Sequence, residues 1–193
     1  MNRGAAEVLA TLSDLGILLK QDKRLPNVVT LVTGESLSAS WWSHPKGRLI
    51  FGVLSELADH PDVLITKLLS AKDTLVHRRL WPAFLAMATS GDTWQREKLS
   101  PGARALLARV RRSKEPARAS GPAVKELASR LLVHTADRHS ESGRHEIVVQ
   151  SWRSWARQAG VDERLSAAQG REAIEAACRA IGAPLSALPW GDT

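Results

Sequence analysis

The second half of the chain contains two proline-initiated helices followed by two short strands, and this order limits the folds that it can adopt. Ser100 is a helix cap, and Pro101 takes the first helical position, where its missing amide hydrogen is not needed. Ser120, Gly121 and Pro122 begin a second helix in a similar way. The expected elements are helices over 101–113 and 121–130, strands over 131–135 and 145–149, and a polar turn over 140–143.

Two helices followed by a hairpin with a polar tip is the element order of a winged-helix module. The connector over 113–120 is too short for the separate middle helix that such a module normally has. We therefore expect a winged-helix-like C-terminal half, with both helices lying along a nucleic-acid backbone. The tip over 138–144, which carries Arg138 and Arg144, is expected to enter a groove as a wing does.

The first half mixes amphipathic helices with one predicted β-hairpin. Apolar residues recur every three or four positions over 5–19, which predicts a helix that Gly16 can end early. The β-branched run at 28–32 fits either a strand or the start of a helix. The other expected elements are helices over 46–58 and 82–88, hairpin strands over 63–69 and 74–80, and a polar boundary over 89–99.

Two further helices are expected over 152–160 and 166–181, and Trp190 is expected to dock the end of the chain. A length of 193 residues allows one domain or two small ones. We expect an α+β fold, mostly helical with two β-hairpins. Its two halves, 1–90 and 99–193, are expected to pack as one body, because the connectors are short and both halves contain tryptophan.

Two adjacent tryptophans precede the helix expected over 46–58. Ser43 or His44 is expected to cap this helix, with Pro45 in its first turn. Neighbouring side chains in an extended segment point in opposite directions. One of the indoles of Trp41 and Trp42 should therefore be largely buried, and the other should cover the rim of a site near Lys46.

Positive charge follows the two tryptophans directly. Lys46 and Arg48 lie beside the expected N-terminus of the helix, which is itself a positive end. Such an end next to flat indole faces suits a phosphate or a base. The alternative is that the indoles belong to the hydrophobic core and that the residues before the helix cap it without binding a ligand. The candidate nucleic-acid ligands here are Trp41, Trp42, His44, Lys46 and Arg48.

The net charge of +7 is concentrated in one window of the chain. Residues 96–130 hold ten basic and three acidic side chains, so this window carries the whole excess. A local basic excess favours a polyanionic partner, although a solvated arginine-rich helix is the alternative. The candidate phosphate contacts in this window are Arg104, Arg109, Arg111, Arg112 and Lys125.

The strand expected over 74–80 ends in three consecutive basic or titratable residues. With a period of two, His77 and Arg79 share one face of the strand and Arg78 lies on the other. At least one face near the strand end must therefore meet water or an anion. We expect His77, Arg78 and Arg79 to extend the nucleic-acid footprint.

A single cysteine, Cys178, permits no internal disulfide and is compatible with a reducing cytoplasm. No apolar run reaches the length that spans a bilayer, and the N-terminus does not resemble a signal peptide. We therefore expect a cytoplasmic protein without a membrane partner. The sequence does not indicate an oligomeric state.

Three strings, at 40–47, 66–82 and 131–152, resemble a family of uncharacterised bacterial proteins. The family pattern is roughly Trp-Trp-x-His-Pro-x-Gly, then Val-His-Arg-Arg-Leu-Trp-Pro, then His-Thr-(x)-Ser-Gly-(x)-His. This resemblance covers most of the chain and implies no activity. A weaker similarity is to winged-helix DNA glycosylases, which carry a Gln-x-Asp or Gln-x-Gln pair. The strings Gln95-Arg96-Glu97 and Gln150-Ser151-Trp152 do not match that pair, so this similarity implies architecture alone.

The hairpin expected after residue 130 is rich in metal-ligand residue types. If His134 and His145 lay opposite each other, they could hold a divalent ion with Asp137 or Glu141. The spacing matches no closed zinc motif, and a polar wing is the preferred interpretation. No phosphate-binding loop or dinucleotide fingerprint is present, so we expect no cofactor and no resident metal.

The sequence thus predicts a winged-helix-type protein that binds nucleic acid, with double-stranded DNA as the expected partner. One alternative is an enzyme acting on nucleic acid, with His44 or His77 near the chemistry. A second alternative is a module that recruits a protein partner through exposed Trp41, Trp42 and Trp81. The sequence leaves open whether the chain is an enzyme.

Overall fold

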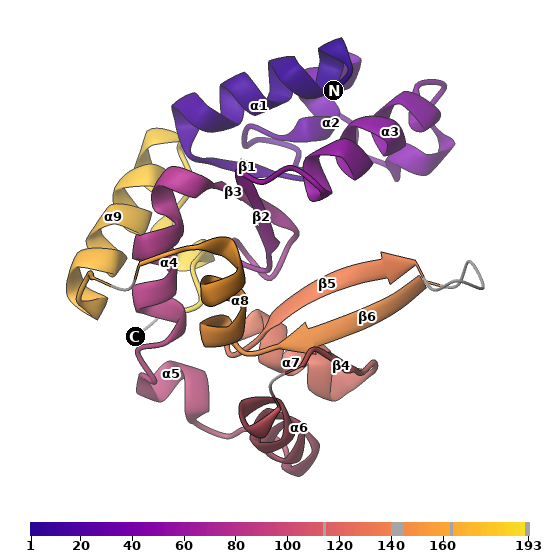
Figure 1. The fold of residues 1–193 in the computed structure, drawn as a ribbon. Coiled ribbons are helices and arrows are strands. Elements are labelled where there is room, and N and C mark those ends of the chain that lie inside the picture. The colour runs from indigo at the N-terminus through magenta and orange to yellow at the C-terminus, as the bar shows by residue number, and fades with distance from the viewer. Residues whose placement is uncertain (114, 140–144, 163, 192–193) are drawn as a thin grey trace.

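The computed structural model describes residues 1–113, 115–139, 145–162 and 164–191. About half of the chain is helical, and two small antiparallel sheets of three strands each complete the α+β fold (Figure 1). The first half holds α1 (Arg3–Leu15), β1 (Ile17–Leu19), α2 (Val28–Thr33), η1 (Trp41–Ser43), α3 (Gly47–Ala58), β2 (Val63–Thr66), β3 (Thr74–His77), η2 (Arg78–Leu80) and α4 (Trp81–Ala88). The second holds α5 (Thr93–Arg96), α6 (Pro101–Arg112), β4 (Ala117–Arg118), α7 (Pro122–Ser129), β5 (His134–His139), β6 (His145–Gln150), α8 (Trp152–Ala159), α9 (Ala167–Ala180) and η3 (Leu185–Ala187).

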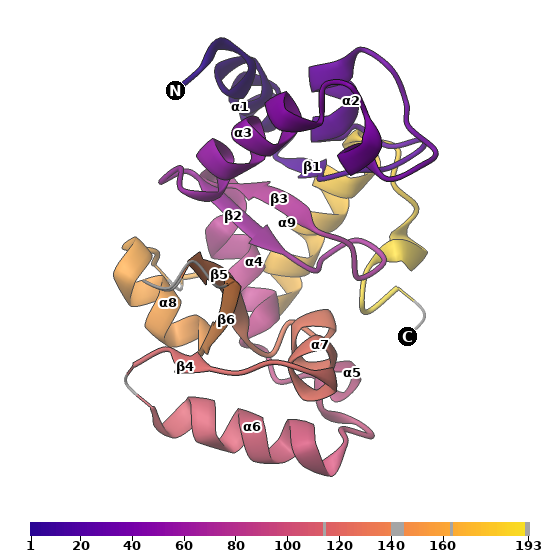
Figure 2. The same cartoon turned by 90° about the vertical axis from the view of Figure 1, so that its right-hand side faces the viewer.

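The first sheet has the strand order β1-β3-β2 and separates two hydrophobic clusters. Helices α1, α2 and α3 cover one face, onto which Leu18 and Leu75 point. Helices α4 and α9 cover the other, onto which Ile17 and Val76 point (Figure 2). Because side chains alternate between the two faces along each strand, this one sheet contributes apolar side chains to both clusters.

The helix predicted over 5–19 is shorter than expected, and its last residues form β1. Gly16 has a φ of 83°, and its amide donates to the carbonyl of Leu12, so it ends α1 in the left-handed conformation that glycine favours. Residues 17–19 then pair with β3. At 28–32, the helical alternative is correct, because Asn27 caps the amide of Thr30 and begins α2.

The first predicted hairpin is confirmed, with shorter strands than expected. β2 and β3 pair in antiparallel register over 63–66 and 74–77. Residues 78–80 form the 3₁₀ turn η2 instead of continuing the strand. The prediction that Arg78 and Arg79 lie on opposite faces of a strand is therefore wrong, because the alternation ends at His77.

The second sheet, of strand order β4-β6-β5, contains the second predicted hairpin. The first strand of this hairpin, β5, begins at His134 instead of 131, because Leu131 has a φ of 51° and turns the chain after α7. The two-residue strand β4 lies in the connector over 113–120 and was not predicted. The predicted turn over 140–143 lies outside the described residues.

The polar boundary expected over 89–99 contains the short helix α5. The side chain of Gln95 is fully buried there: its Oε1 accepts from the amide of Gly91 at 2.8 Å, and its Nε2 donates to the carbonyl of Ala88 at 3.0 Å. This connector is thus anchored by a buried amide side chain.

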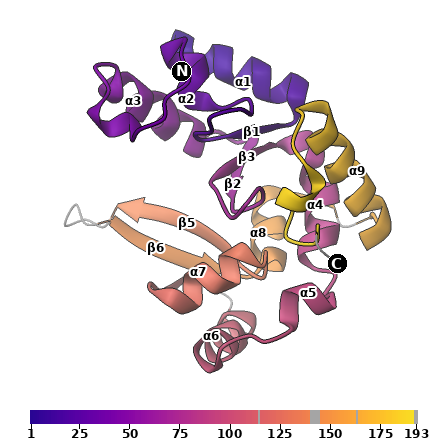
Figure 3. The ribbon, with the colours of Figure 1, turned by 180° about the vertical axis from the view of Figure 1, so that it is seen from behind.

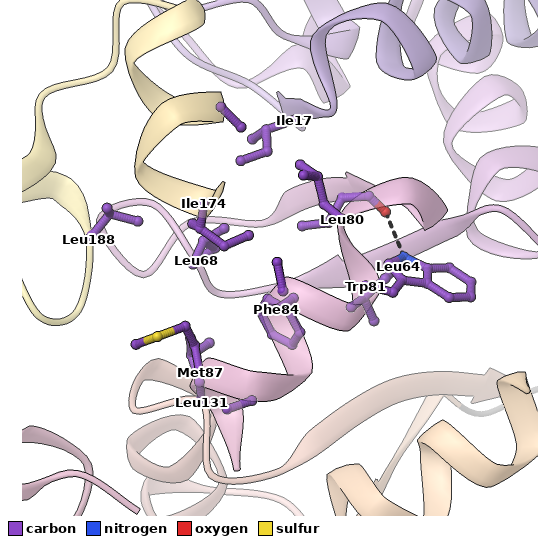
Figure 4. Packing of buried hydrophobic residues seen from close by; sticks show 14 of the residues in the cluster. Ile17, Leu64, Leu68, Leu80, Trp81, Phe84, Met87, Leu131, Ile174 and Leu188 are labelled. Atoms are coloured by element: carbon purple, nitrogen blue, oxygen red, sulfur yellow. Dashed lines mark hydrogen bonds between the residues drawn. The ribbon is translucent and has the colours of Figure 1, made fainter. Parts of the chain in front are cut away.

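One buried cluster contains residues from both sides of that boundary. Phe84 of α4 packs edge-on with Trp152 of α8. Ile174 of α9 and Leu131 belong to the same cluster as Phe84 (Figure 4). Trp190 belongs to it as well, and its indole donates to Glu175 at 3.1 Å. The division into halves 1–90 and 99–193 stays a prediction. In the described part of the chain, every helix is too short or too polar to span a lipid bilayer.

We expect the chain to unfold in one cooperative transition, because this cluster joins the two halves. Gly170→Ala tests the junction, since a Cβ there would lie 2.5 Å from the carbonyl oxygen of Ala83. Overpacking of this kind should lower the free energy of unfolding by about 1–3 kcal/mol. Urea titrations followed by tryptophan fluorescence and far-UV circular dichroism should report the same lowered midpoint.

Gly52→Ala is the matched control, since a methyl group added at this position in α3 would have no neighbouring atom within 4 Å. It should raise the free energy of unfolding by about 0.5–1 kcal/mol. Two separate transitions, or a Gly170→Ala effect seen by one probe alone, would contradict cooperative unfolding.

A histidine contributes to the junction between β5 and α8. The ring of His134 stacks on Trp155 at 5.6 Å between centroids and meets Trp152 edge-on at 5.4 Å. Its Nδ1 accepts from the side-chain amide of Gln150 at 3.3 Å. Burial lowers the pKa of His134 from 6.5 to about 4, so the folded protein holds this ring neutral at pH 7.

The stability of the protein should therefore depend on pH through His134. Between pH 6.5 and about 4 the unfolded chain binds a proton that the folded chain excludes. The free energy of unfolding should fall as the pH is lowered through this window, by up to about 1.4 kcal/mol per pH unit. Urea titrations across this window should show a shallower dependence for His134→Gln than for the parent protein. Equal slopes in His134→Gln and the parent would rule out this role.

Candidate nucleic-acid interface

The carboxyl end of α6 projects two arginines away from its buried side. Ser100 caps this helix by accepting from the amide of Ala103 at 3.1 Å. An apolar stripe, centred on Leu107 and Val110, packs against α7 and the second sheet. Because the stripe occupies one side of the helix, Arg111 and Arg112 are left exposed.

The first turns of α8 project two more arginines toward the same region. Ser151 begins this helix, and its hydroxyl accepts from the amide of Ser154. Trp152 and Trp155 are buried in the central cluster, which turns the opposite side of the helix outward. Arg153 and Arg157 lie on that side, one turn apart, and both are exposed.

Residues of these two helices line a hollow. Figure 2 shows α8 on the same side of the molecule as the carboxyl end of α6. A smaller, more enclosed pocket adjoins it and shares Arg111, Ser151 and Arg153. This pocket adds Arg96, from the end of α5. We call the five arginines that line the two hollows the arginine groove: Arg96, Arg111, Arg112, Arg153 and Arg157.

The arginine groove concentrates positive charge without acidic compensation. Among the described residues, none of its five guanidinium groups takes part in an ion pair. Partial desolvation, followed by the charges of Arg96 and Arg153, lowers the pKa of Arg111 from its ordinary value. The three side chains therefore repel one another in the free protein, and an anion placed among them would relieve that repulsion.

Three of these residues were not predicted as site residues from the sequence. Arg96 was counted in the basic window without a role, and Arg153 and Arg157 lie outside it. One available signal was the position of Arg153 in the first turn of α8. A cation there faces the positive end of the helix, where acidic side chains are preferred.

Several other basic side chains of the window are engaged elsewhere. Arg104 donates to the carbonyl of Leu99, and Arg130 donates to those of Trp94 and Glu97. Arg118 pairs with Glu146 at 3.0 Å. Arg109 points to the other side of α6 and donates to the carbonyl of Arg118 at 3.5 Å, and Lys125 is exposed on α7. The basic window is thus divided over several surfaces.

The predicted difference between the two adjacent tryptophans is confirmed, for another reason than expected. Trp41 is 5% exposed and Trp42 is 66% exposed. The segment forms the 3₁₀ turn η1, and the indoles stack at 4.0 Å instead of pointing in opposite directions. Trp42 also meets Phe51 of α3 at 5.7 Å between ring centroids.

The polar residues after the tryptophans join α2 to α3. His44 Nδ1 accepts from the amide of Lys46, and its Nε2 lies 3.0 Å from Glu35. The ammonium group of Lys46 donates to the carbonyl of Thr33, at the end of α2. Since α3 begins at Gly47, the prediction that Pro45 lies in its first turn is wrong, as is the prediction of a cap from the side chain of Ser43 or His44.

The predicted ligands at the start of α3 lie far from the arginine groove. Lys46 and Arg48 are at the start of α3, at the opposite end of the molecule from α6 in each view (Figures 1–3). Arg48 is exposed. His77 accepts from the amide of Arg79, and burial lowers the pKa of His77 although the charge of Asp62 opposes this shift.

Arg78 and Arg79 differ in their surroundings. Arg78 pairs with Asp62 at 3.5 Å and lies over the ring of Trp81. Arg79 donates to the carbonyl oxygens of Ser13 and Asp14, both at 2.9 Å. Those carbonyls lie in the last turn of α1 and lack partners within the helix. Arg79 therefore caps α1 from a distant part of the chain.

The register of the second hairpin bears on the proposed metal site. His134 pairs in register with Gln150, and His145 with His139, so the less favoured alternative, in which His134 and His145 lie opposite each other, does not occur. The described residues contain no cluster of three His, Cys, Asp or Glu side chains that could hold a metal ion. Arg138 pairs in register with Glu146; its side chain, Arg144 and the tip over 140–144 lie outside the described part.

Comparisons of the chain with family models, with curated proteins and with solved structures find no match. The resemblance to an uncharacterised bacterial family therefore stays a prediction.

We expect Arg79→Ala to lower the free energy of unfolding by about 1–2 kcal/mol, because two helix-end carbonyls lose a charged donor. Arg78→Ala is the matched control and should cost less than about 1 kcal/mol, since its ion pair is exposed. Urea titration of both variants measures the difference. Equal losses of stability would show that Arg79 does not act as a helix cap.

Proposed function

We propose that this protein binds nucleic acid, with double-stranded DNA as the partner, and that the arginine groove is its main phosphate-binding surface. The observation that carries the proposal is the convergence of five exposed arginines from α5, α6 and α8 without an acidic partner among the described residues. Guanidinium groups bind phosphate oxygens through charge-assisted, frequently bidentate hydrogen bonds. Phosphate neutralisation supplies most of the affinity in protein–DNA complexes that lack base contacts.

The architecture around the groove supports a winged-helix-type module. Helix α6, strand β4, helix α7 and the hairpin β5–β6 follow one another, and the strands have the order β4-β6-β5. Strand β4 stands where such a module normally has a further helix. The hairpin extends away from the body of the molecule, as a wing would (Figures 1 and 3). In this arrangement α7, with exposed Lys125, lies beside the hairpin.

A second candidate is a protein partner at the exposed aromatic residues of the first half. Trp42 and Phe51 are 66% and 43% exposed and contact each other. Trp81, which was expected to share this surface, is buried at 4% exposure. The enzyme alternative has less support, because His44 and His77 line neither of the hollows of the arginine groove.

Arg111→Gln combined with Arg153→Gln should weaken binding to every duplex sequence alike. Each lost phosphate contact should flatten the slope of log affinity against log salt by about one unit. The measurement is fluorescence anisotropy with a labelled duplex at several salt concentrations. The free energy of unfolding should change by less than about 1 kcal/mol, because exposed charges contribute little to it.

Lys23→Gln combined with Arg24→Gln is the control, since it removes the same charge from an exposed loop of the first half. It should leave the salt slope nearly unchanged. Equal effects of the two double variants would show that net charge, and not the groove, governs binding. Absence of binding by the parent protein at low salt would refute the proposed function.

A further inference from the structure

The enclosed pocket at one end of the arginine groove has two kinds of wall. Its floor is apolar and consists of buried side chains: Ala88, Leu107, Val110, Leu132 and Trp152. Its rim holds the guanidinium-bearing residues Arg96, Arg111 and Arg153, with no acidic side chain among the lining residues. The pocket has a volume of about 370 Å³, at the low end of the range for small-ligand sites.

The floor lies where two hydrophobic clusters meet. Leu107, Val110 and Leu132 belong to the cluster of α6, α7 and the second sheet, whereas Ala88 and Trp152 belong to the central cluster. The indole of Trp152 donates to the carbonyl of Leu131, and the amide of Gln95 is bonded on both sides. The polar groups of these two side chains are therefore satisfied within the protein, and the apolar side chains contribute only part of the pocket surface, beside Thr89 and Ser151.

The rim depends on a glycine. Arg96 lies against Gly91, where a Cβ would come within 2.3 Å of its guanidinium nitrogen. Gly91 has a φ of 73°, a conformation that other residues adopt at a cost. The backbone thus leaves room for a guanidinium group directly beside the apolar floor.

A ligand that contacts both walls would combine a flat, weakly polar group with a phosphate. A nucleotide has this composition. A base within a duplex cannot enter such a pocket, because the neighbouring base pairs cover both of its faces. We propose that the pocket receives the base of one unpaired nucleotide of a bound nucleic acid, with the adjoining phosphates on Arg96, Arg111 and Arg153. This inference rests on the proposed function and adds a preference for unpaired nucleotides.

The test compares three labelled DNAs at one salt concentration by fluorescence anisotropy. They are a fully paired duplex, the same duplex with one extrahelical thymidine, and the same duplex with an extrahelical abasic site. The thymidine bulge should bind about tenfold more tightly than the paired duplex, since base stacking contributes about 1–3 kcal/mol. The abasic bulge should resemble the paired duplex, since it shares the altered backbone and lacks the base.

Thr89→Phe should remove this preference by filling the pocket from its half-buried edge, while the salt-dependent affinity for paired duplex remains. Thr89→Val is the control, because it removes only the hydroxyl that donates to the carbonyl of Leu85. Thermal unfolding of both variants verifies that they are folded. Arg111→Gln combined with Arg153→Gln should weaken binding to all three DNAs.

Equal affinities of the parent protein for the three DNAs would overturn the inference and leave the proposed duplex binding intact. Equal affinities for the thymidine and abasic bulges would also overturn it, because backbone flexibility would then explain the preference. Binding to vesicles of anionic phospholipid that Thr89→Phe abolishes, without any bulge preference, would assign the pocket to a lipid. No binding to any DNA at low salt would refute the proposed function itself.

Discussion

The burial of two tryptophans of α8 determines where the arginine groove can form. Trp152 packs edge-on against Phe84 of α4, and Trp155 packs edge-on against Trp81 at the start of the same helix. The indole of Trp152 also donates to the carbonyl of Leu131 at 2.8 Å, which ties the segment after α7 to the central cluster. These contacts set the rotation of α8 about its axis, so Arg153 and Arg157 must face α6. Large aromatic side chains with a satisfied polar group hold such an orientation well.

The position of the enclosed pocket follows from the same constraint. Two separately packed clusters meet beside Trp152, and helix-to-helix packing along such a seam leaves concave places that neither cluster fills. The connector that contains α5 closes one side of the seam, because Gln95 anchors it to the end of α4 and reaches toward the carbonyl of Leu131. The three arginines of the rim therefore belong to three different elements, α5, α6 and α8. The packing of the two hydrophobic clusters determines the relative positions of these elements.

Local signals in the sequence were sufficient for most of the helices and for both hairpins. Caps such as Ser100 and Ser151, and left-handed glycines such as Gly16 and Gly160, act within a few residues of the elements that they bound. Strands β1 and β4, which add a third strand to each hairpin, were not predictable in this way. They are only three and two residues long, and they owe their conformation to pairing with distant strands. The groove was predictable only in part. Arg96, Arg111 and Arg112 belong to the basic window, whereas Arg153 and Arg157 lie outside it and join them through tertiary packing.

Some basic side chains in this protein already donate hydrogen bonds to other protein groups, and others do not. This difference identifies the candidate site better than a count of charges does. Arg79 and Arg130 are bonded to backbone carbonyls at the ends of structural segments, and Lys46 serves α2 in the same way. Removal of such a side chain would leave carbonyls without partners, so its presence is explained by the fold alone. Arg111 and Arg153 have no comparable bond in the described part of the chain, and partial desolvation, followed by the repulsion of Arg96 and Arg153, lowers the pKa of Arg111. A folded chain gains nothing from that repulsion. The negatively charged partner that we propose would relieve it.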